Sequence, residues 1–269
     1  MLYFVSTPIG NLEDISIRAI NTLKSVDIIA CEDTRHSKIL LDNYGITAKT
    51  IAYHKFNEHV SADGIIALLK EGKNVAVISD AGMPVINDPG NVLARKLHEE
   101  NIPYTIVPGA NAGLCALILS GFDATKFAFF GFLSEKNKEL KQQLSEINNF
   151  NGTKILYSSK HNVNKDLSSL HSVLGDVRVA IVSEITKMHE TTSIVTLPYQ
   201  LDNPKGEFVL VIEQPKQIAI ETPTDKELLK ELTALLKTQD KNTAIKTVKE
   251  KYGLTKSYIY NLYEKNKNT

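Results

Sequence analysis

The sequence predicts two α/β domains followed by a small helical tail. Over the first 120 residues, short apolar runs alternate with segments whose apolar residues recur at helical spacing. Strand-like runs then outnumber helical segments over residues 121–218, and residues 225–269 show no strand pattern. Alternating strands and helices are typical of βαβ units on a parallel sheet, whereas consecutive strands favour a mixed sheet.

Length and composition agree with this division. The chain has 269 residues, of which 42% are hydrophobic, so each domain can bury a core. The formal net charge is zero, which excludes a uniformly basic protein but allows a local basic patch. The N-terminus lacks a basic leader, no apolar run is long enough to span a bilayer, and no C-x-x-C spacing is present. We therefore expect a cytoplasmic protein with no membrane segment, no metal site and two free thiols, Cys31 and Cys115.

The N-terminal domain, residues 1–120, is expected to alternate strands with helices throughout. The strands are the apolar runs at residues 2–5, 28–30, 50–53, 75–78 and 104–107. The helices, recognised by apolar residues three or four positions apart, are residues 15–26, 37–43, 62–70, 91–99 and 110–119. Right-handed crossovers would bring the carboxyl ends of all these strands to one edge of the sheet.

The second domain, residues 121–218, is expected to hold a mixed sheet. Its strands are residues 127–130, 154–157, 178–183, 193–196 and 207–212. Its helices are a charged segment at residues 136–147 and a second at residues 164–174. The last three strands follow one another without a helix between them, which favours a mixed sheet.

The tail, residues 225–269, is expected to form three helices, at residues 226–237, at residues 243–251, and from Thr255 to about Lys265. The hydroxyl of Thr255 is suited to cap the third helix. From residue 241 onward the chain carries seven lysines but only two acidic residues. A helix–glycine turn–helix with basic faces resembles a helix-turn-helix that contacts nucleic acid; the alternative is a solvated tail packed on the body.

Polar loops follow the strands of the first domain, at residues 6–11, 31–37, 53–59, 79–90 and 108–113. In open α/β sheets, ligands bind at this edge. The loop Ser79–Gly90 (SDAGMPVINDPG) contains two prolines, which reduce the entropy lost when a ligand is bound. Neither G-x-G-x-x-G nor G-x-x-x-x-G-K-[ST] is present, so a mostly neutral ligand such as a nucleoside is favoured over a chain of phosphates.

Five segments of these loops and strands carry a family resemblance. The segments TPIGN, CEDTRHS, SDAGMPVINDPG, VPGANAG and FFGFL, in this order, resemble the tetrapyrrole-methylase-type methyltransferases, and among them the ribosomal RNA small subunit methyltransferase I branch. The resemblance covers roughly residues 1–215. It implies two α/β domains of that type, with S-adenosylmethionine bound in the cleft between them. It also implies a homodimer that methylates the 2′-hydroxyl of a cytidine in the decoding region of 16S rRNA, on the small ribosomal subunit.

The resemblance places the cofactor against three of the loops and the start of the last strand. The implied contacts with S-adenosylmethionine are Pro8, Ser79, Asp80, Gly82, Met83, Asn111, Ala112 and Glu207. A carboxylate at Asp80 could accept hydrogen bonds from the amine or hydroxyls of the cofactor. The alternative is that Asp80 caps the turn that follows it and that the other positions only form turns.

The segment after the second strand supplies the catalytic candidates, Glu32, Asp33 and Arg35. Methyl transfer to a hydroxyl is an in-line displacement, which needs alignment and an acceptor for the hydroxyl proton. Glu32 or Asp33 could accept that proton, and Arg35 could pair with an rRNA phosphate. The alternative is a structural ion pair with a helix N-cap from Asp33 or Thr34.

The candidates for contact with substrate RNA are Arg18, Thr34, His54, Asn57, Lys160 and His161. The last two lie in Ser158–Asn162 (SSKHN), where the family usually has a Glu-Ser-Pro-His-Arg-like segment. Lys160 would replace the missing positive charge, although as a point charge and not as a planar guanidinium. The family also usually has a GPSA-like turn where this chain has Gly109–Ala112 (GANA).

Two other functions remain open at this point. The first is a porphyrinoid C-methyltransferase of the same fold. Such enzymes typically carry a glycine-rich first loop of the GAGPGD kind, where this chain has STPIGN. They also lack a basic helical tail. The second is a regulator that binds nucleic acid without catalysis. Such a protein would not need polar residues at so many strand ends.

Overall fold

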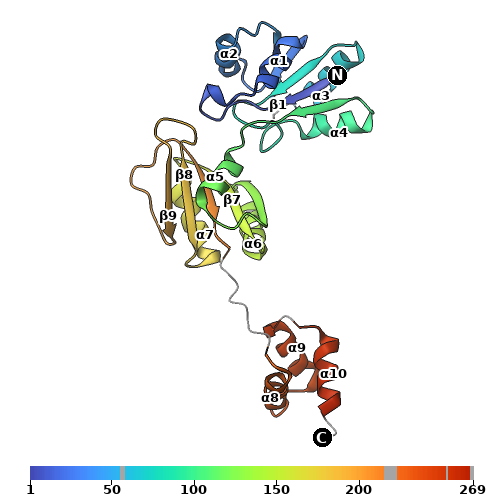
Figure 1. Ribbon diagram of the computed structural model, residues 1–269, viewed down its shortest axis with the longest axis vertical. Helices are drawn as coiled ribbons and strands as arrows, with labels where there is room; N and C mark the ends of the chain where they lie inside the picture. Colours follow the sequence, from blue (N-terminus) through green and yellow to red (C-terminus); the bar gives the residue numbers. More distant parts are fainter. Residues whose placement is uncertain (55–57, 215–222, 253, 267–269) are drawn as a thin grey trace. The chain divides into compact units, whose positions relative to one another are not determined.

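The structure, a computed structural model, describes residues 1–54, 58–214, 223–252 and 254–266. It separates into two compact units, Met1–Gln214 and Pro215–Thr269, here called the body and the tail (Figure 1). Both sheets belong to the body, and the described part of the tail contains helices alone.

The first sheet of the body is parallel throughout. Its strands are β1 (Leu2–Val5), β2 (Ile28–Cys31), β3 (Lys49–Ala52), β4 (Val75–Ile78) and β5 (Tyr104–Val107). They lie in the order β3-β2-β4-β1-β5, and every neighbouring pair is parallel. Strands β2 and β4 are buried on both faces, which explains why their sequences are continuous apolar runs. The predicted parallel sheet, with its strand ends on one edge, is confirmed.

Helices cover both faces of this sheet. Two of them, α1 (Ile17–Ser25) and α2 (Thr34–Asn43), pack on one face in a core with Ile29 and Ile78. The other face is covered by α3 (Glu58–Lys70) and α4 (Asn91–Glu99). This is the layered arrangement expected of a parallel α/β sheet.

Two helix starts differ from the periodic pattern because capping residues set them. A 3₁₀ helix, η1 (Leu12–Asp14), precedes α1, and the Ser16 hydroxyl accepts a hydrogen bond from the Ala19 amide at 3.1 Å. Helix α2 begins three residues earlier than expected, because the Asp33 carboxylate accepts a hydrogen bond from the Arg35 amide at 2.8 Å. Caps, and not apolar spacing, decide where these helices begin.

The second sheet of the body is mixed, as predicted. Its strands are β6 (Phe127–Phe132), β7 (Thr153–Ser159), β8 (Arg178–Ser183), β9 (Thr191–Thr196) and β10 (Glu207–Ile212). They lie in the order β6-β7-β10-β8-β9, with β6 and β7 parallel and the other pairs antiparallel. One face is covered by α6 (Asn137–Asn149) and α7 (Val163–Leu174).

The opposite face of the second sheet is covered by α5 (Ala112–Ser120). The side chains of Ala116 and Leu117 are buried there against Ile155, Ala180 and Val209. The sequence analysis assigned this helix to the first domain, and the structure corrects that assignment. The helix segment AGLCALILS is apolar on nearly every side, so its sequence does not show which sheet it covers.

The tail packs three helices around a core of its own. They are α8 (Asp225–Leu235), α9 (Lys241–Tyr252) and α10 (Lys256–Asn266), and Leu228, Leu232, Ile245, Val248 and Ile259 are buried between them. A capping box joins Thr224 and Glu227 at the start of α8. The predicted cap of α10 is confirmed, because the Thr255 hydroxyl accepts a hydrogen bond from the Tyr258 amide at 3.3 Å.

Candidate functional site

The loops after β1 and β4 are joined by direct hydrogen bonds at the carboxyl edge of the first sheet. The Thr7 amide donates to the Gly82 carbonyl at 2.8 Å, and the Thr7 hydroxyl donates to the Ser79 carbonyl at 3.2 Å. The loop after β5 approaches just as closely, since a Cβ at Gly109 would lie 2.8 Å from the Cβ of Ser6. The loops after β1, β4 and β5 are therefore packed directly against one another.

The loop Ser79–Gly90 holds unusual backbone conformations. Gly82 and Gly90 have φ of 82° and 138°, while Val85 has φ 76° and Asn87 has φ 69°. A positive φ is costly for a β-branched residue such as Val85, on the order of 1–3 kcal/mol. Such strain persists only where surrounding contacts impose it, and it concentrates at functional sites.

Contacts from two other elements hold this loop in place. The Glu58 carboxylate at the start of α3 accepts hydrogen bonds from the Gly90 amide at 2.7 Å and the Val92 amide at 3.1 Å. From the second sheet, Gly131 lies against Asn87, because a Cβ at Gly131 would be 2.9 Å from the Asn87 amide oxygen. The loop is therefore fixed from both halves of the body.

The second sheet also contributes the loop between β8 and β9. The Asn11 amide donates to the Thr186 hydroxyl at 3.0 Å, and a Cβ at Gly10 would lie 2.7 Å from the Cγ of Lys187. The Lys187 ammonium lies 3.2 Å from the Glu184 carboxylate and 3.4 Å from the Glu207 carboxylate. These contacts place a lysine and two glutamates beside the end of β1.

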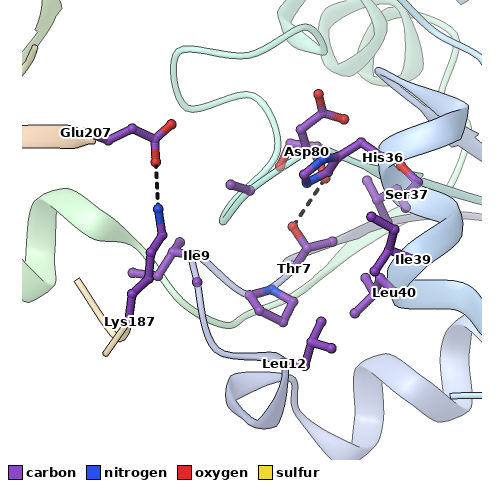
Figure 2. Close-up of a pocket in the computed structure, with 15 residues that line it drawn as sticks. Thr7, Ile9, Leu12, His36, Ser37, Ile39, Leu40, Asp80, Lys187 and Glu207 are labelled. Carbon is purple, nitrogen blue, oxygen red and sulfur yellow. Dashed lines mark hydrogen bonds and ion pairs between the residues drawn. The ribbon is translucent and has the colours of Figure 1, made fainter. Parts of the chain in front are cut away.

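Two adjoining cavities open among these loops. The larger, of about 590 Å³ and here called the histidine cavity, has seven polar lining residues: Thr7, His36, Ser37, Ser79, Asp80, Lys187 and Glu207. Figure 2 shows His36 and Asp80 on one side of it and the Lys187–Glu207 ion pair on the other. The smaller, of about 370 Å³ and here called the aromatic cavity, is lined in part by Met83, Phe132, Tyr157 and Phe208.

The two cavities share a wall and differ in charge. Ile9, Asp80, Ala81 and Glu207 line both. Only the histidine cavity has a histidine and a lysine in its described lining, His36 and Lys187; the described lining of the aromatic cavity contains carboxylates, amides and hydroxyls but no lysine, arginine or histidine. The shared wall therefore separates a cavity whose two carboxylates are accompanied by a lysine from a more acidic cavity that is suited to a cation.

Asp80, on the shared wall, is oriented from the second strand. Its Oδ1 accepts a hydrogen bond from the Asp33 amide at 3.1 Å, which ties the loop after β4 to the start of α2. A carboxylate held in this way can present its other oxygen to a ligand without losing rotamer entropy on binding.

The catalytic candidates after β2 form an ion pair. The Arg35 guanidinium donates to the Asp33 carboxylate through Nη2 at 2.8 Å and Nε at 3.2 Å, and this pairing holds the pKa of Asp33 well below its usual range. So acidic a carboxyl is a poor proton acceptor, because efficient acceptors have a pKa near the working pH. The geometry favours a positioning role for Asp33 and Arg35. Glu32 lines the aromatic cavity.

Every residue proposed to contact the cofactor lines one of the two cavities. Six line the aromatic cavity: Asp80, Gly82, Met83, Asn111, Ala112 and Glu207. Pro8 and Ser79 line the histidine cavity. The side chain of Asn111 is already engaged, because it caps α5 by accepting from the Leu114 amide at 3.0 Å, so it can offer its amide group to a ligand only in part.

The residues proposed to contact RNA lie outside both cavities. Arg18, His54, Lys160 and His161 are exposed, and Thr34 is the first residue of α2. Asn57 lies outside the described residues. None of the described members lines either cavity, so their contact with RNA stays a prediction.

Several lining residues were missed by the sequence analysis. His36 was left without a role although it lies within the CEDTRHS segment, three residues after Asp33. Lys187 lies in none of the quoted segments, whereas Phe132 lies within FFGFL but was given no role. Tyr157 packs edge to face against Phe129 and Phe132, with ring centroids 4.7 and 5.7 Å apart, and burial raises the pKa of its hydroxyl.

The described residues also contain neither a metal-binding cluster nor a membrane-spanning helix. Across the described ranges, no three or more histidine, cysteine, aspartate or glutamate side chains are placed to hold a metal ion together. Within the same ranges, no helix combines the length and apolarity needed to cross a membrane.

Most of the chain is similar in sequence to a known protein family and to several of its members. Residues 1–199 match the family described as Tetrapyrrole (Corrin/Porphyrin) Methylases. The ribosomal RNA small subunit methyltransferase I of Bacillus subtilis is 44% identical over 218 residues, which cover 79% of this chain and 75% of that protein. The protein of the same name in Mycoplasmopsis pulmonis is 43% identical over 215 residues, covering 78% of this chain and 96% of its own.

Solved structures give the same fold at much lower sequence identity. The crystal structure of the methyltransferase CobJ superimposes with a TM-score of 0.62 over 80% of this chain and 94% of its own, at 17% identity. A likeness at this identity concerns the fold alone.

Proposed function

Because this chain belongs to the tetrapyrrole methylase family and, within it, to the ribosomal RNA small subunit methyltransferase I family, we propose that it methylates small-subunit rRNA. The methyl donor is S-adenosylmethionine. The acceptor is the 2′-hydroxyl of a cytidine ribose in the decoding region of 16S rRNA, and the enzyme acts in the cytoplasm on the small ribosomal subunit.

One observation carries this proposal: two cavities with different linings, one with a histidine and a lysine and the other with aromatic rings and more carboxylates, meet at a shared wall that contains Asp80 and Glu207. Direct transfer of a methyl group needs donor and acceptor in adjoining sites, with the reacting atoms aligned and about 3–3.5 Å apart. A protein that only senses a ligand would need one of these cavities but not both.

The aromatic cavity suits the donor. S-adenosylmethionine carries a sulfonium and an ammonium group, and carboxylates such as Glu32 and Asp80 favour such charges. The rings of Phe132 and Tyr157 can contact the adenine or the sulfonium. The same lining disfavours phosphate, since none of its described residues is cationic. When bound, the donor supplies an electrophilic methyl group. Asp80, held by the Asp33 amide, orients it.

The histidine cavity suits the acceptor nucleotide. Lys187 would exchange its ion pairs with Glu184 and Glu207 for a phosphate. The hydroxyls of Thr7 and Ser79 already donate to backbone carbonyls, so they provide acceptors for a ribose hydroxyl. Asp33 is too acidic to take the 2′-hydroxyl proton effectively. We assign that proton to the imidazole of His36, the side chain most often used for this step, which lines this cavity and not the other.

Arg35 and the exposed polar residues around the cavities would contact the rest of the RNA. Arg35 is held by Asp33 but its side chain is 90% exposed, so it can also meet a phosphate. The remaining proposed contacts are Arg18, Thr34, His54, Asn57, Lys160 and His161.

A homodimer belongs to the proposal as well. The outer face of α5 exposes Leu114 at 45% and Ile118 at 79%, and the edge strand β5 exposes Tyr104 and Ile106 at 41% and 43%. Exposed apolar side chains in this number are typical of a surface that a second protein covers. Sedimentation of the purified chain tests this part, with a monomer at micromolar concentration as the contrary result.

The test of the reaction is transfer of labelled methyl from S-adenosylmethionine. Three acceptors are compared: small ribosomal subunits, free rRNA and a porphyrin precursor. Label in rRNA, mapped to a cytidine ribose, is the expected result. Label only in the porphyrin would assign the chain to the other activity of its fold, and label on a base would contradict the 2′-hydroxyl as acceptor.

A further inference from the structure

The zero net charge of the chain hides a division between its two units. The tail, Pro215–Thr269, contains 11 lysines and 7 acidic residues, a net charge of +4. Because the whole chain has 31 basic and 31 acidic residues, the body carries a net charge of −4. An acidic catalytic unit repels RNA at long range, and a basic unit on the same chain can offset this repulsion.

Most acidic residues in the described part of the tail form hydrogen bonds or ion pairs within the tail itself. Five of them cap helices or pair with neighbouring side chains: Asp225 with Tyr258, Glu227 with Thr224, Glu231 with Lys251 and Tyr252, Asp240 with Thr243, and Glu264 with Lys241. Glu231 and Glu264 are neutralised by lysines, and the other three carboxylates are occupied by hydroxyl donors, so the net charge of the tail stays positive.

Most lysines of the tail have no such partner. Within the described part of the tail, six exposed lysines form no ion pair: Lys226, Lys230, Lys237, Lys249, Lys256 and Lys265. The core of the tail is made of leucine, isoleucine, valine and alanine side chains, so it does not depend on these lysines. Lysines that neither pair nor pack are available to a partner.

An exposed aromatic ring accompanies these charges on α10. Tyr260 is 44% exposed, and the Lys241 ammonium lies 4.1 Å from the centroid of its ring. Aromatic rings beside cations are the usual means of holding unpaired bases and their phosphates. An acidic protein partner would use the lysines but would have no need of the ring.

We propose that the tail is an RNA-binding unit, which contacts the phosphate backbone through Lys249 on α9 and Lys256 and Lys265 on α10, and a base through Tyr260. RNA as the partner rests on the proposed function. The tail raises the affinity of an acidic enzyme for its substrate without taking part in methyl transfer.

The experiment compares two triple variants of the full chain. The first, Lys249→Gln, Lys256→Gln and Lys265→Gln, removes three charges from the tail and keeps good helix formers. The control, Lys73→Gln, Lys138→Gln and Lys141→Gln, removes three exposed charges from the body. Affinity for small-subunit rRNA is measured against salt concentration, and circular dichroism verifies that both variants fold.

The tail variant should lower the slope of log affinity against log salt by about 2, since each lost phosphate contact removes about 0.7–0.9. At moderate salt the KM for rRNA should rise about tenfold or more, while kcat and S-adenosylmethionine binding stay unchanged. Tyr260→Ala should weaken rRNA binding with no change of slope, and Tyr260→Phe should not weaken it.

Equal slopes for the tail and body variants would overturn the proposal. So would equal loss of binding to rRNA and to polyglutamate, because the tail would then bind any polyanion. A changed slope in a protein that transfers no methyl group to rRNA would leave the tail proposal standing and refute the proposed function, so the two failures are distinguishable.

Discussion

The histidine cavity and the aromatic cavity share four lining residues, yet they differ in what they can bind. Both are built by the same sheet edge, but the aromatic cavity takes its distinguishing rings from β6, β7 and β10, whereas the histidine cavity takes its imidazole from α2. A parallel sheet edge supplies a common wall, and the neighbouring elements determine the charge on each side. Substitutions in the histidine cavity should therefore affect binding of the acceptor nucleotide, and substitutions in the aromatic cavity should affect binding of the methyl donor.

The largest effect is expected at His36. His36→Gln should lower kcat by about 100-fold or more, the usual contribution of a positioned proton acceptor. Binding of S-adenosylmethionine should be unchanged. His98→Gln, at an exposed histidine of α4, serves as the control. A kcat in His36→Gln equal to that of the control would assign the proton acceptor to another residue.

The shared wall should be the next most sensitive element. In Gly82→Ala, the new Cβ would meet Ile9 at 3.1 Å and the Ala110 carbonyl oxygen at 3.4 Å, which disturbs both cavities. Gly72→Ala is a matched control, because Gly72 has a similar positive φ of 85° but open space around it. Both variants should lose about 1–2 kcal/mol of stability from the strained conformation. Only Gly82→Ala should also lose activity, by about 100-fold.

If the two variants lost activity equally, backbone strain alone would explain the result. The shared wall would then have no special part in aligning donor and acceptor.

A smaller effect, on binding, should distinguish the aromatic cavity from the histidine cavity. Phe132→Ala should weaken S-adenosylmethionine binding about tenfold, in keeping with about 1–2 kcal/mol for a ring beside a desolvated cation. It should leave the KM for rRNA unchanged. Phe127→Ala, on the same strand and similarly exposed but outside the cavity, should change neither value.

Lys187→Gln should show the reverse pattern, with a raised KM for rRNA and normal cofactor binding. Calorimetry for the cofactor and steady-state kinetics for rRNA distinguish these outcomes.

The smallest effect concerns stability and pH. Burial raises the pKa of Asp166, whose carboxylate accepts a hydrogen bond from the Ser158 hydroxyl at 2.5 Å behind the aromatic cavity. Its contribution to stability is complete below its ordinary pKa of about 4 and is lost as pH rises through the folded-state value. The melting temperature of Asp166→Asn, relative to the unchanged protein, should therefore rise between pH 4 and neutrality.

Asp33 provides the opposite case. Its lowered pKa means that its contribution is present above the ordinary value and is lost as pH falls through the folded-state value. Asp33→Asn should therefore be less stable than the unchanged protein at neutral pH, with the difference shrinking in acid. Parallel pH trends in the two variants would contradict one of these assignments.

The sequence predicted the sheets and loops well because their signals are local. Apolar runs such as Val75–Ile78 and loops rich in proline and glycine identify themselves without knowledge of their partners. The position of α5 could not be predicted, since a helix that is apolar on nearly every side fits either sheet. The sequence could not rank Asp33 and His36 as proposed proton acceptors, because the ion pair that lowers the pKa of Asp33 and the cavity that His36 lines are visible only in the structure.

The glycines at positions 10 and 131 restrict how the two halves of the body can change during evolution. A methyl group at Gly10 would strike the loop between β8 and β9, and one at Gly131 would strike Asn87. At these two positions the halves are packed so closely that no side chain larger than glycine fits. A chimaera that joined the first sheet of this chain to the second sheet of a distant homologue would therefore fail at this seam, even if each half came from an active enzyme.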